Sequence, residues 1–305
     1  MREAIIVEYR QMKYLLTIAE SGSITAAAEK LFISQPALSA FVRKTEKSLG
    51  AELFDRSTAP ITLTYAGRIY IKTAERIVRI YEKMLRQLED ISEEKAGRLA
   101  VGMPVMLHAY CAPELERRAR SCMGNTELEV IVSDEDELIR KLMQRQLNMV
   151  ILSLYKPIPD FVCVEIASEN LYVIARHEYI GNTQADCADD DVIHLNQIAD
   201  CPVFTRPASR RISSMSQQVF DSAAIIPSNL VECPSQASEI MLSISGHGIS
   251  IVPEHVIRVI RTEKTVQQYR LDEQFSKAGI YAVFAKDTYV GRLERAYMQM
   301  IKDSI

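Results

Sequence analysis

The strongest constraint in the sequence is a long segment, residues 65–94, that contains no proline and only one glycine, Gly67 in its first turn. Apolar side chains recur in this segment at alternating spacings of four and three residues. They are Tyr70, Ala74, Ile77, Tyr81, Met84, Leu88 and Ile91. A helix that packs on its own domain usually shows a wider apolar face. The segment therefore predicts one long helix that dimerises through a narrow stripe; packing of the stripe on the chain's own body is the alternative.

Residues 9–49 predict three further helices. Two short helical patterns lie within residues 9–31, on either side of the break Ser21-Gly22-Ser23. Ser34 fits the N-cap of the third helix, because its hydroxyl accepts a hydrogen bond from a free backbone N–H, and Pro36 is tolerated in a first turn. This helix should end near Ser48, with Gly50 as its stop.

The third helix has one apolar and one polar, basic face. At roughly 100° of rotation per residue, the apolar face holds Leu38, Val42, Thr45 and Leu49, and the other face holds Pro36, Ser39, Ala40, Arg43 and Lys47. Such a basic face is typical of a recognition helix in a DNA major groove. Alternation in residues 51–56 and 61–64 predicts a two-stranded wing with Arg56 near its tip, and Thr64 can cap the long helix.

The formal net charge of −4 does not by itself indicate a nucleic-acid partner. The charge is unevenly distributed, however. Residues 1–72 contain ten Lys and Arg against seven Asp and Glu, a surplus of three positive charges, so the other 233 residues carry a net charge of −7. A basic segment on an acidic body fits a phosphate-facing module joined to a part with another role.

After Gly97 the pattern changes to strands that alternate with helices. The predicted strands are 98–103, 127–132, 149–152, 162–166, 171–176, 202–205, 230–232, 249–252 and 280–285, and the clearest helical patterns are 135–147, 212–223, 238–245, 254–260 and 291–301. This alternation favours parallel sheets with helices on both faces. Residues 97–305 are long enough for two such sheets, and 181–191 is expected to be a loop.

Residues 7–94 closely resemble the LysR-type transcriptional regulators. The resemblance is carried by 19–31 (AESGSITAAAEKL), 33–39 (ISQPALS), Glu46, Leu49-Gly50, 53–56 (LFDR) and 63–67 (LTYAG). It implies an α/β multidomain chain with a winged helix-turn-helix at 7–64, a linker helix at 65–94 and an effector-binding region at 97–305. That region would hold two α/β subdomains joined by two crossovers, about 97–167 with 273–305, and about 168–272.

The resemblance also implies the DNA contacts, which are Ser23, Thr25, Ser34, Gln35, Pro36, Ser39, Arg43 and Arg56. Hydroxyls and helix N-termini bind phosphate, Gln pairs with adenine, and Arg pairs with guanine or phosphate. The alternative is structural: Ser34 only caps its helix, and Thr25 only borders the turn. Ala40 departs from the family, which commonly places a long polar residue there, so the base preference is expected to differ.

In this family the effector lies in the crevice between the subdomains. Carried over to this sequence, that points to Met103, Pro104, Val105, Ser153, Thr205, Arg206, Ser209 and Ser235, which lie at the carboxyl ends of predicted strands. Arg206 or Arg210 can pair with a carboxylate, which suggests an organic anion with a hydrophobic part. Solvated surface arginines are the alternative. No other cofactor and no metal site are expected.

Several other classes fit less well. The composition, 48% hydrophobic and 25% charged, is that of a globular protein of two or three domains. The sequence lacks nucleotide-binding, hydrolase and metalloprotease motifs, and the glycine turn around His247 is expected to be structural, so an enzyme is not predicted. A binding protein without a DNA role would leave the basic segment and the heptad stripe unexplained. The six scattered cysteines suggest buried thiols, with a redox-responsive regulator as a lesser alternative.

The predicted function is therefore a ligand-responsive transcriptional regulator. Its expected partners are double-stranded operator DNA, a small-molecule effector, and a second copy of the chain in a homodimer that assembles into a homotetramer, with RNA polymerase as a further candidate. Without an apolar run of membrane length or a signal peptide, the chain is expected in the cytoplasm.

Overall fold

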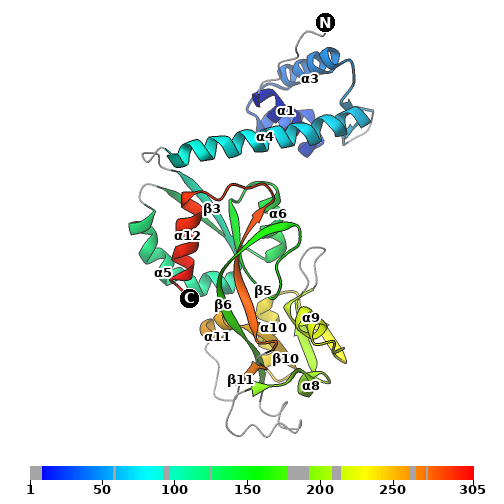
Figure 1. The fold of residues 1–305 in the computed structure, drawn as a ribbon. Coiled ribbons are helices and arrows are strands. Elements are labelled where there is room, and N and C mark those ends of the chain that lie inside the picture. The colour runs from blue at the N-terminus through cyan, green and yellow to red at the C-terminus, as the bar shows by residue number, and fades with distance from the viewer. Residues whose placement is uncertain are drawn as a thin grey trace. The chain divides into compact units, whose positions relative to one another are not determined.

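The computed structural model describes residues 9–57, 60–91, 97–123, 126–176, 192–207, 214–260, 266–272 and 274–305 (Figure 1). The chain divides into two compact units, Met1–Glu93 and Glu94–Ile305. Each unit has its own buried apolar core. The predicted loop 181–191 and the N-terminal extension before Val7 lie outside the described residues.

The first unit contains the helices and the wing that the sequence predicts. Its elements are α1 (Tyr9–Ser21), α2 (Ile24–Lys30), α3 (Gln35–Leu49), β1 (Phe54–Asp55), β2 (Thr62–Leu63) and α4 (Tyr65–Ile91). The Ser34 hydroxyl caps α3 by accepting a hydrogen bond from the Ala37 N–H at 3.4 Å. Gly50 ends this helix in the left-handed region, with φ 66°, where glycine carries no steric penalty.

The wing and the start of α4 are held together at Gly67. A Cβ atom at this position would lie 1.9 Å from the carbonyl oxygen of Leu53, so only glycine allows the helix to approach the strand this closely. The Thr64 hydroxyl accepts a hydrogen bond from the Gly67 N–H at 2.9 Å, which confirms the predicted cap. The wing strands β1 and β2 pair antiparallel, Phe54 with Leu63.

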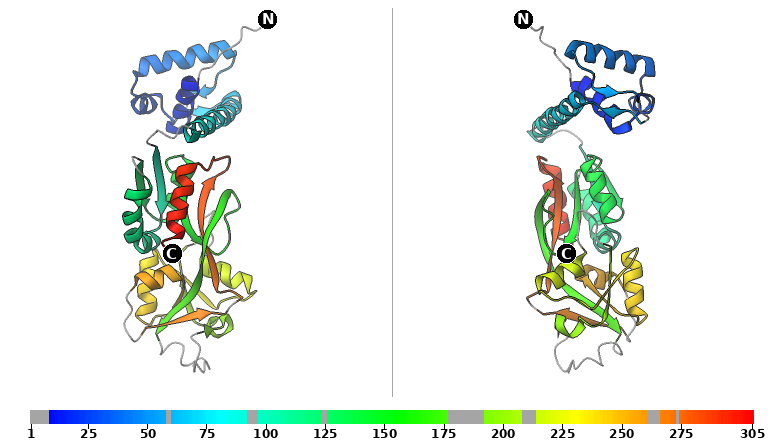
Figure 2. Two further views of the ribbon diagram at one scale, coloured as in Figure 1. Left: turned by 60° about the vertical axis from the view of Figure 1, so that its left-hand side comes forward. Right: turned by 90° about the vertical axis from the view of Figure 1, so that its right-hand side faces the viewer.

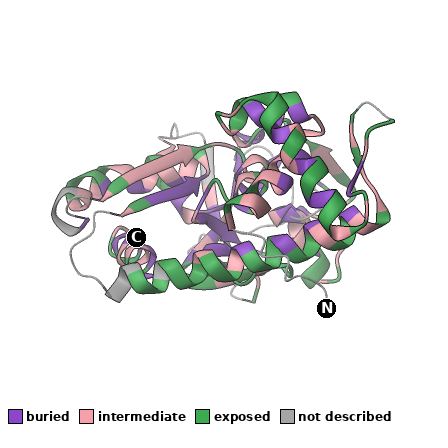
Figure 3. Ribbon diagram, turned by 90° about the horizontal axis from the view of Figure 1, so that it is seen from above, coloured by how far each residue is buried: buried purple, intermediate pink, exposed green. Residues whose placement is uncertain are grey.

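The apolar residues of α4 divide into two groups. Ile71, Ala74 and Val78 are buried in the first unit, where α4 packs along α1. Farther along, Ile77, Ile80, Tyr81, Met84, Leu85 and Leu88 form an exposed apolar stripe (Figure 3). The ring of Tyr81 also contacts Tyr9, with ring centroids 4.4 Å apart. The predicted seam therefore packs partly on the chain's own unit and partly faces outward.

The second unit begins with subdomain I, a five-stranded sheet in the order β4-β3-β5-β12-β6. Its strands are β3 (Arg98–Met103), β4 (Glu127–Val132), β5 (Met149–Leu154), β12 (Lys277–Ala285) and the first part of β6 (Phe161–Arg176). Residues alternate between its two faces. Leu99, Val101 and Ile151 lie in the cluster that includes residues of α5 (Val105–Cys122) and α12 (Arg292–Lys302), whereas Ala100 and Val150 lie in the cluster with α6 (Glu135–Met143).

Subdomain II is built on the second half of β6, which is paired there with β10 and β11 (Figure 2). Its further strands are β7 (Val192–Ile193), β8 (Pro202–Thr205), β9 (Asn229–Glu232), β10 (Ile249–Pro253) and β11 (Val266–Leu271). Its helices are α8 (Leu195–Ile198), α9 (Met215–Ser222), α10 (Gln236–Ile244) and α11 (Glu254–Val259). Residues of α8 and α9 pack in one apolar cluster, and residues of α10 and α11 pack in another, on the two sides of the strands.

Three features differ from the sequence predictions. β6 is one strand rather than two, because the polar residues Ser168–Asn170 continue its pairing with β12. The sheets are mixed rather than parallel, since β12 is antiparallel to β5 and β6. Helices α5 and α8 and strands β7 and β11 were not predicted; α5 contains Pro113, which normally interrupts a helix.

Candidate DNA-binding surface and ligand pocket

Helix α3 presents an exposed basic face. Gln35, Pro36 and Arg43 are exposed, together with Lys44 and Lys47. The buried side of the same helix holds Leu38 and Val42, as its periodicity predicts. The remaining predicted contacts are Thr25, Ser34 and Arg56, which are exposed, and Ser23 and Ser39, which are partly buried. The surface therefore combines hydroxyl, amide and guanidinium groups around a helix N-terminus.

A buried carboxylate joins α3 to the wing. Oε1 of Glu46 accepts hydrogen bonds from the backbone N–H groups of Leu53 (2.8 Å) and Phe54 (3.1 Å), and Oε2 pairs with Arg56 Nη2 at 2.7 Å. Arg56, predicted as an outward DNA contact, is thus engaged inside its own unit. The Glu46 position could be anticipated from the helix arithmetic, which places it at about 20°, beside the apolar face.

In the second unit, a small pocket lies where several strands end. It is lined by Pro104, Leu107, Glu135, Ser153, Thr205, Arg206, Met215, Ser216, Gln236, Glu239, Ile251, Pro253 and His255. These residues come from both subdomains, as expected for a crevice at the carboxyl ends of strands. The cavity measures about 20 Å³, which is room for one water-sized group.

An ion pair crosses this pocket. Arg206 Nη1, which follows β8 in subdomain II, lies 2.9 Å from Glu135 Oε1 at the start of α6 in subdomain I. Both side chains are mostly covered, with 28% and 14% of their surfaces exposed. The predicted carboxylate partner of Arg206 is therefore supplied by the chain itself.

Glu239 is the least satisfied carboxyl group in the pocket. Its side chain projects from the first turn of α10, and the residue is 4% exposed. Within the described residues, no group donates a hydrogen bond to its carboxyl oxygens. Burial raises the pKa of Glu239 to about 8; the Arg206 charge opposes this increase and the Glu135 charge adds to it. At neutral pH this carboxyl group therefore keeps its proton.

A second buried carboxylate lies where β6 passes between the subdomains. Glu169 accepts a hydrogen bond from the Ser153 hydroxyl at 2.6 Å and from the His255 backbone N–H at 3.1 Å, and His255 Nδ1 lies 2.9 Å from it. The serine is bonded to the carboxylate and not to the imidazole. Ser153 therefore acts as one of the donors that hold the buried Glu169 carboxylate, and not as half of a Ser-His nucleophile pair.

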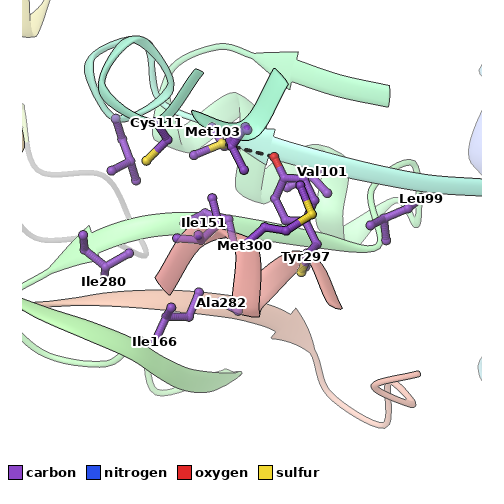
Figure 4. Packing of buried hydrophobic residues seen from close by; sticks show 14 of the residues in the cluster. Leu99, Val101, Met103, Cys111, Ile151, Ile166, Ile280, Ala282, Tyr297 and Met300 are labelled. Atoms are coloured by element: carbon purple, nitrogen blue, oxygen red, sulfur yellow. Dashed lines mark hydrogen bonds between the residues drawn. The ribbon is translucent and has the colours of Figure 1, made fainter. Parts of the chain in front are cut away.

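Half of the predicted effector residues line the pocket: Pro104, Ser153, Thr205 and Arg206. Met103 is instead fully buried in the subdomain I core, where its sulfur accepts a hydrogen bond from the Tyr297 hydroxyl at 3.7 Å (Figure 4). Val105 is 60% exposed at the start of α5, outside the lining. Ser235 is the exposed N-cap of α10, also outside it. Ser209 and Arg210 lie outside the described residues.

The sequence predictions missed three ionisable pocket residues: Glu135, Glu239 and His255. Each lies at the start of a helix that follows a strand. The expectation that ligands bind at the carboxyl ends of strands, which selected Ser153 and Thr205, therefore applies to them too. Their pairing was not predictable, because it joins residues that are distant in sequence.

The cysteines whose side chains the structure describes are Cys111, Cys163, Cys201 and Cys233, and all four are free thiols. Burial raises the pKa of each one, that of Cys111 to about 12. A thiolate is the form that reacts with oxidants, so these environments disfavour a redox-sensing role.

Over the residues that the structure describes, no group of three or more His, Cys, Asp or Glu is placed to hold a metal ion. No helix in that part of the chain combines the length and apolar composition of a membrane span.

A winged helix-turn-helix unit followed by an α/β unit with a pocket between two subdomains defines a DNA-binding transcriptional regulator. Models of the "Bacterial regulatory helix-turn-helix protein, lysR family" and of the "LysR substrate binding domain" match residues 9–68 and 92–305. The chain belongs to the LysR family of transcriptional regulators, and it is a regulator rather than an enzyme.

The chain is also similar to a known regulator in sequence and to two solved structures in fold. The HTH-type transcriptional regulator BsdA of Bacillus subtilis is 28% identical over 83% of this chain and 86% of its own length. A full-length OxyR variant from Pseudomonas aeruginosa has a similar fold, with a TM-score of 0.68 and 19% identity over 98% of this chain and 94% of its own. Full-length CbnR complexed with its target DNA also matches, with a TM-score of 0.57 and 23% identity over 98% of this chain and all of that one.

Replacing Glu46 should destabilise the first unit. Glu46→Ala leaves the Leu53 and Phe54 N–H groups without a partner, so we expect a loss of about 2 kcal/mol or more in unfolding free energy. Thermal unfolding of the full chain measures this loss. Glu52→Ala is the matched control, because Glu52 is exposed. Equal stability of the two variants would contradict the role given to Glu46.

Replacing Glu239 should stabilise the second unit in a pH-dependent way. Its pKa is about 8 in the folded state against roughly 4.5 when unfolded, so the unfolded chain releases this proton first and stability falls as pH rises through that window. Glu239→Gln removes this loss. Its stability gain should be near zero at pH ~4.5 and grow by at most about 1.4 kcal/mol per pH unit up to pH ~8. Denaturant titrations across this range test it, and a pH-independent effect would refute it.

Proposed function

We propose that this LysR-type regulator binds operator DNA through the exposed face of α3, dimerises through the distal stripe of α4, and responds to a small molecule in the inter-subdomain pocket. The observation that carries the DNA assignment is the two-sided character of α3. One side is buried in the core of the first unit, and the other presents Gln35, Arg43 and Lys47 to solvent.

Each exposed group has a defined use on duplex DNA. Gln35 can pair with adenine N6 and N7, and Arg43 with guanine or phosphate. Thr25 and Ser34 lie at helix N-termini, where hydroxyl and backbone N–H groups suit phosphate. Ala40 is exposed between them and offers a methyl group for a thymine methyl contact.

The exposed stripe on α4 supports a dimer. Ile77, Met84 and Leu88 are between 42% and 55% exposed and follow coiled-coil spacing. A second copy of α4 provides a matching stripe and would place two α3 helices on an operator with inverted half-sites. Association of two dimers into a tetramer and contact with RNA polymerase extend this proposal.

The pocket supports a role in ligand sensing. Its lining comes from both subdomains, so a bound molecule contacts both and favours one of their relative arrangements. Such a shift would change the geometry of the assembled regulator on DNA without any chemistry on the ligand. The predicted organic anion remains one candidate effector.

Arg43→Ala should weaken DNA binding. Loss of one base or phosphate contact from a major-groove helix should reduce affinity roughly 5- to 100-fold. Fluorescence anisotropy with the DNA that flanks the chain's own gene measures this change. Lys302→Ala is the matched control, because Lys302 is exposed on α12 of the other unit. Unchanged affinity of Arg43→Ala would place the DNA surface elsewhere.

Leu88→Glu should dissociate the dimer. The substitution places a charge in the apolar stripe and removes a side chain whose burial contributes about 1.5–3 kcal/mol per copy. Sedimentation velocity should then show monomers at concentrations where the original chain is dimeric. Gln87→Glu adds the same charge at the neighbouring exposed position and should leave the dimer intact. A dimer that survives Leu88→Glu would exclude this stripe as the interface.

A further inference from the structure

The pocket lining holds two carboxyl groups, Glu135 and Glu239, and one guanidinium group, Arg206. Glu135 pairs with Arg206 at 2.9 Å, and His255, also in the lining, pairs at 2.9 Å with Glu169, which is not part of the lining. Glu239 lines the pocket with no hydrogen bond to its carboxyl oxygens from the described residues, although it is 4% exposed. A buried polar group without a partner is costly, so it marks a place where a ligand can supply the missing donor.

The size of the cavity restricts the group that fits there. About 20 Å³ accommodates one water-sized group, and an ammonium group has nearly that size. An ammonium group also offers three hydrogen-bond donors and a positive charge. It therefore matches the unpartnered carboxyl group in size and, once that group has released its proton, in charge.

We propose that the pocket recognises the protonated amine of a small-molecule effector, with Glu239 as its principal acceptor and Glu135 as the second. This inference rests on the proposed ligand-sensing function and specifies the chemical class of the ligand. The enclosed space holds the ammonium group alone, so the carbon skeleton of the amine extends from it through the open side of the pocket.

A carboxylate is a poorer match for the same place. It would have to displace Glu135 from Arg206, and the charges of the ligand and of Glu135 would then lie close together. Like charges would thus meet in a covered site, where electrostatic interactions are strong. An ammonium group instead adds the cation that this cluster lacks.

The positions of the two acceptors connect binding to subdomain arrangement. Glu135 begins α6 in subdomain I, whereas Glu239 lies on α10 in subdomain II. An amine held by both carboxylates therefore joins the subdomains, alongside the Glu135–Arg206 ion pair. Removing the amine removes that connection.

Proton exchange at Glu239 gives the proposal a distinctive signature. The charged and titratable groups around it are Arg206, Glu135, His255 and the Cys233 thiol. The free protein keeps the Glu239 proton up to about pH 8, but an ammonium ligand requires the ionised carboxylate. Amine affinity should therefore increase roughly tenfold per pH unit from pH ~6 to ~8, and a carboxylate ligand should bind more weakly over the same range.

The test uses isothermal titration calorimetry of the full chain with two matched sets of probes. The first set is ethylamine, L-alanine and propionate, and the second is phenethylamine, L-phenylalanine and 3-phenylpropionate. We expect amine-bearing probes to bind, with tighter binding at higher pH and release of one proton. Glu239→Gln, which resembles the protonated side chain and should fold, is expected to reduce their affinity at least tenfold at pH ~8. Glu232→Gln, an exposed control, should not.

Several results would contradict the assignment of an amine ligand. Binding of propionate or 3-phenylpropionate alone, or equal amine affinity in Glu239→Gln, would overturn the amine assignment while leaving ligand sensing in place. Binding of no amine in either set would also overturn it. DNA binding of the same unaltered preparation, measured in parallel, separates these results from a failure of the proposed regulatory function.

Discussion

The second unit depends on the continuity of β6 through both subdomains. Up to Asn170 this strand pairs with β12, and from Leu171 it pairs with β10, so the two sheets share one backbone. Glu169 lies at this transition and is held by Ser153 and His255, which come from different strand ends. A buried charge is tolerated only when it is paired and hydrogen-bonded. Glu169 meets that condition, and its partners Ser153 and His255 both line the pocket.

Among the buried carboxyl groups of the described residues, Glu46, Glu169 and Glu239 differ in how completely they are satisfied. Glu46 and Glu169 each accept several hydrogen bonds and face one basic partner, and both connect segments that are distant in sequence. Glu239 has no such set of donors, and its pKa is correspondingly raised. The satisfied groups stabilise the fold, because removal of either partner leaves an uncompensated polar atom. The unsatisfied group is destabilising in the ligand-free protein, which is the usual cost of a preformed binding site.

Local chemistry made much of this structure predictable from sequence. The caps Ser34 and Thr64, the stop at Gly50 and the bounds of several strands follow from side-chain hydrogen bonding and periodicity, which act over a few residues. The expectation that ligands bind at the carboxyl ends of strands was likewise correct for half of the predicted effector residues, which line the pocket. Pairings across the fold could not be predicted in this way. The Arg206–Glu135 and Arg56–Glu46 ion pairs join distant residues, and Ser168–Asn170 resemble a polar break although they lie within a strand.

The ion pair across the pocket limits how any effector can act. A ligand shifts an equilibrium between two subdomain arrangements only by its difference in affinity for them, and a tenfold shift requires about 1.4 kcal/mol. A molecule that touches one subdomain alone provides no such difference. Glu135 and Glu239 lie on different subdomains. The Glu135 side chain of subdomain I is already paired with Arg206 of subdomain II. An effector that engages both carboxyl groups therefore acts on a contact that exists without it, so ligand binding changes the strength of subdomain closure rather than creating it.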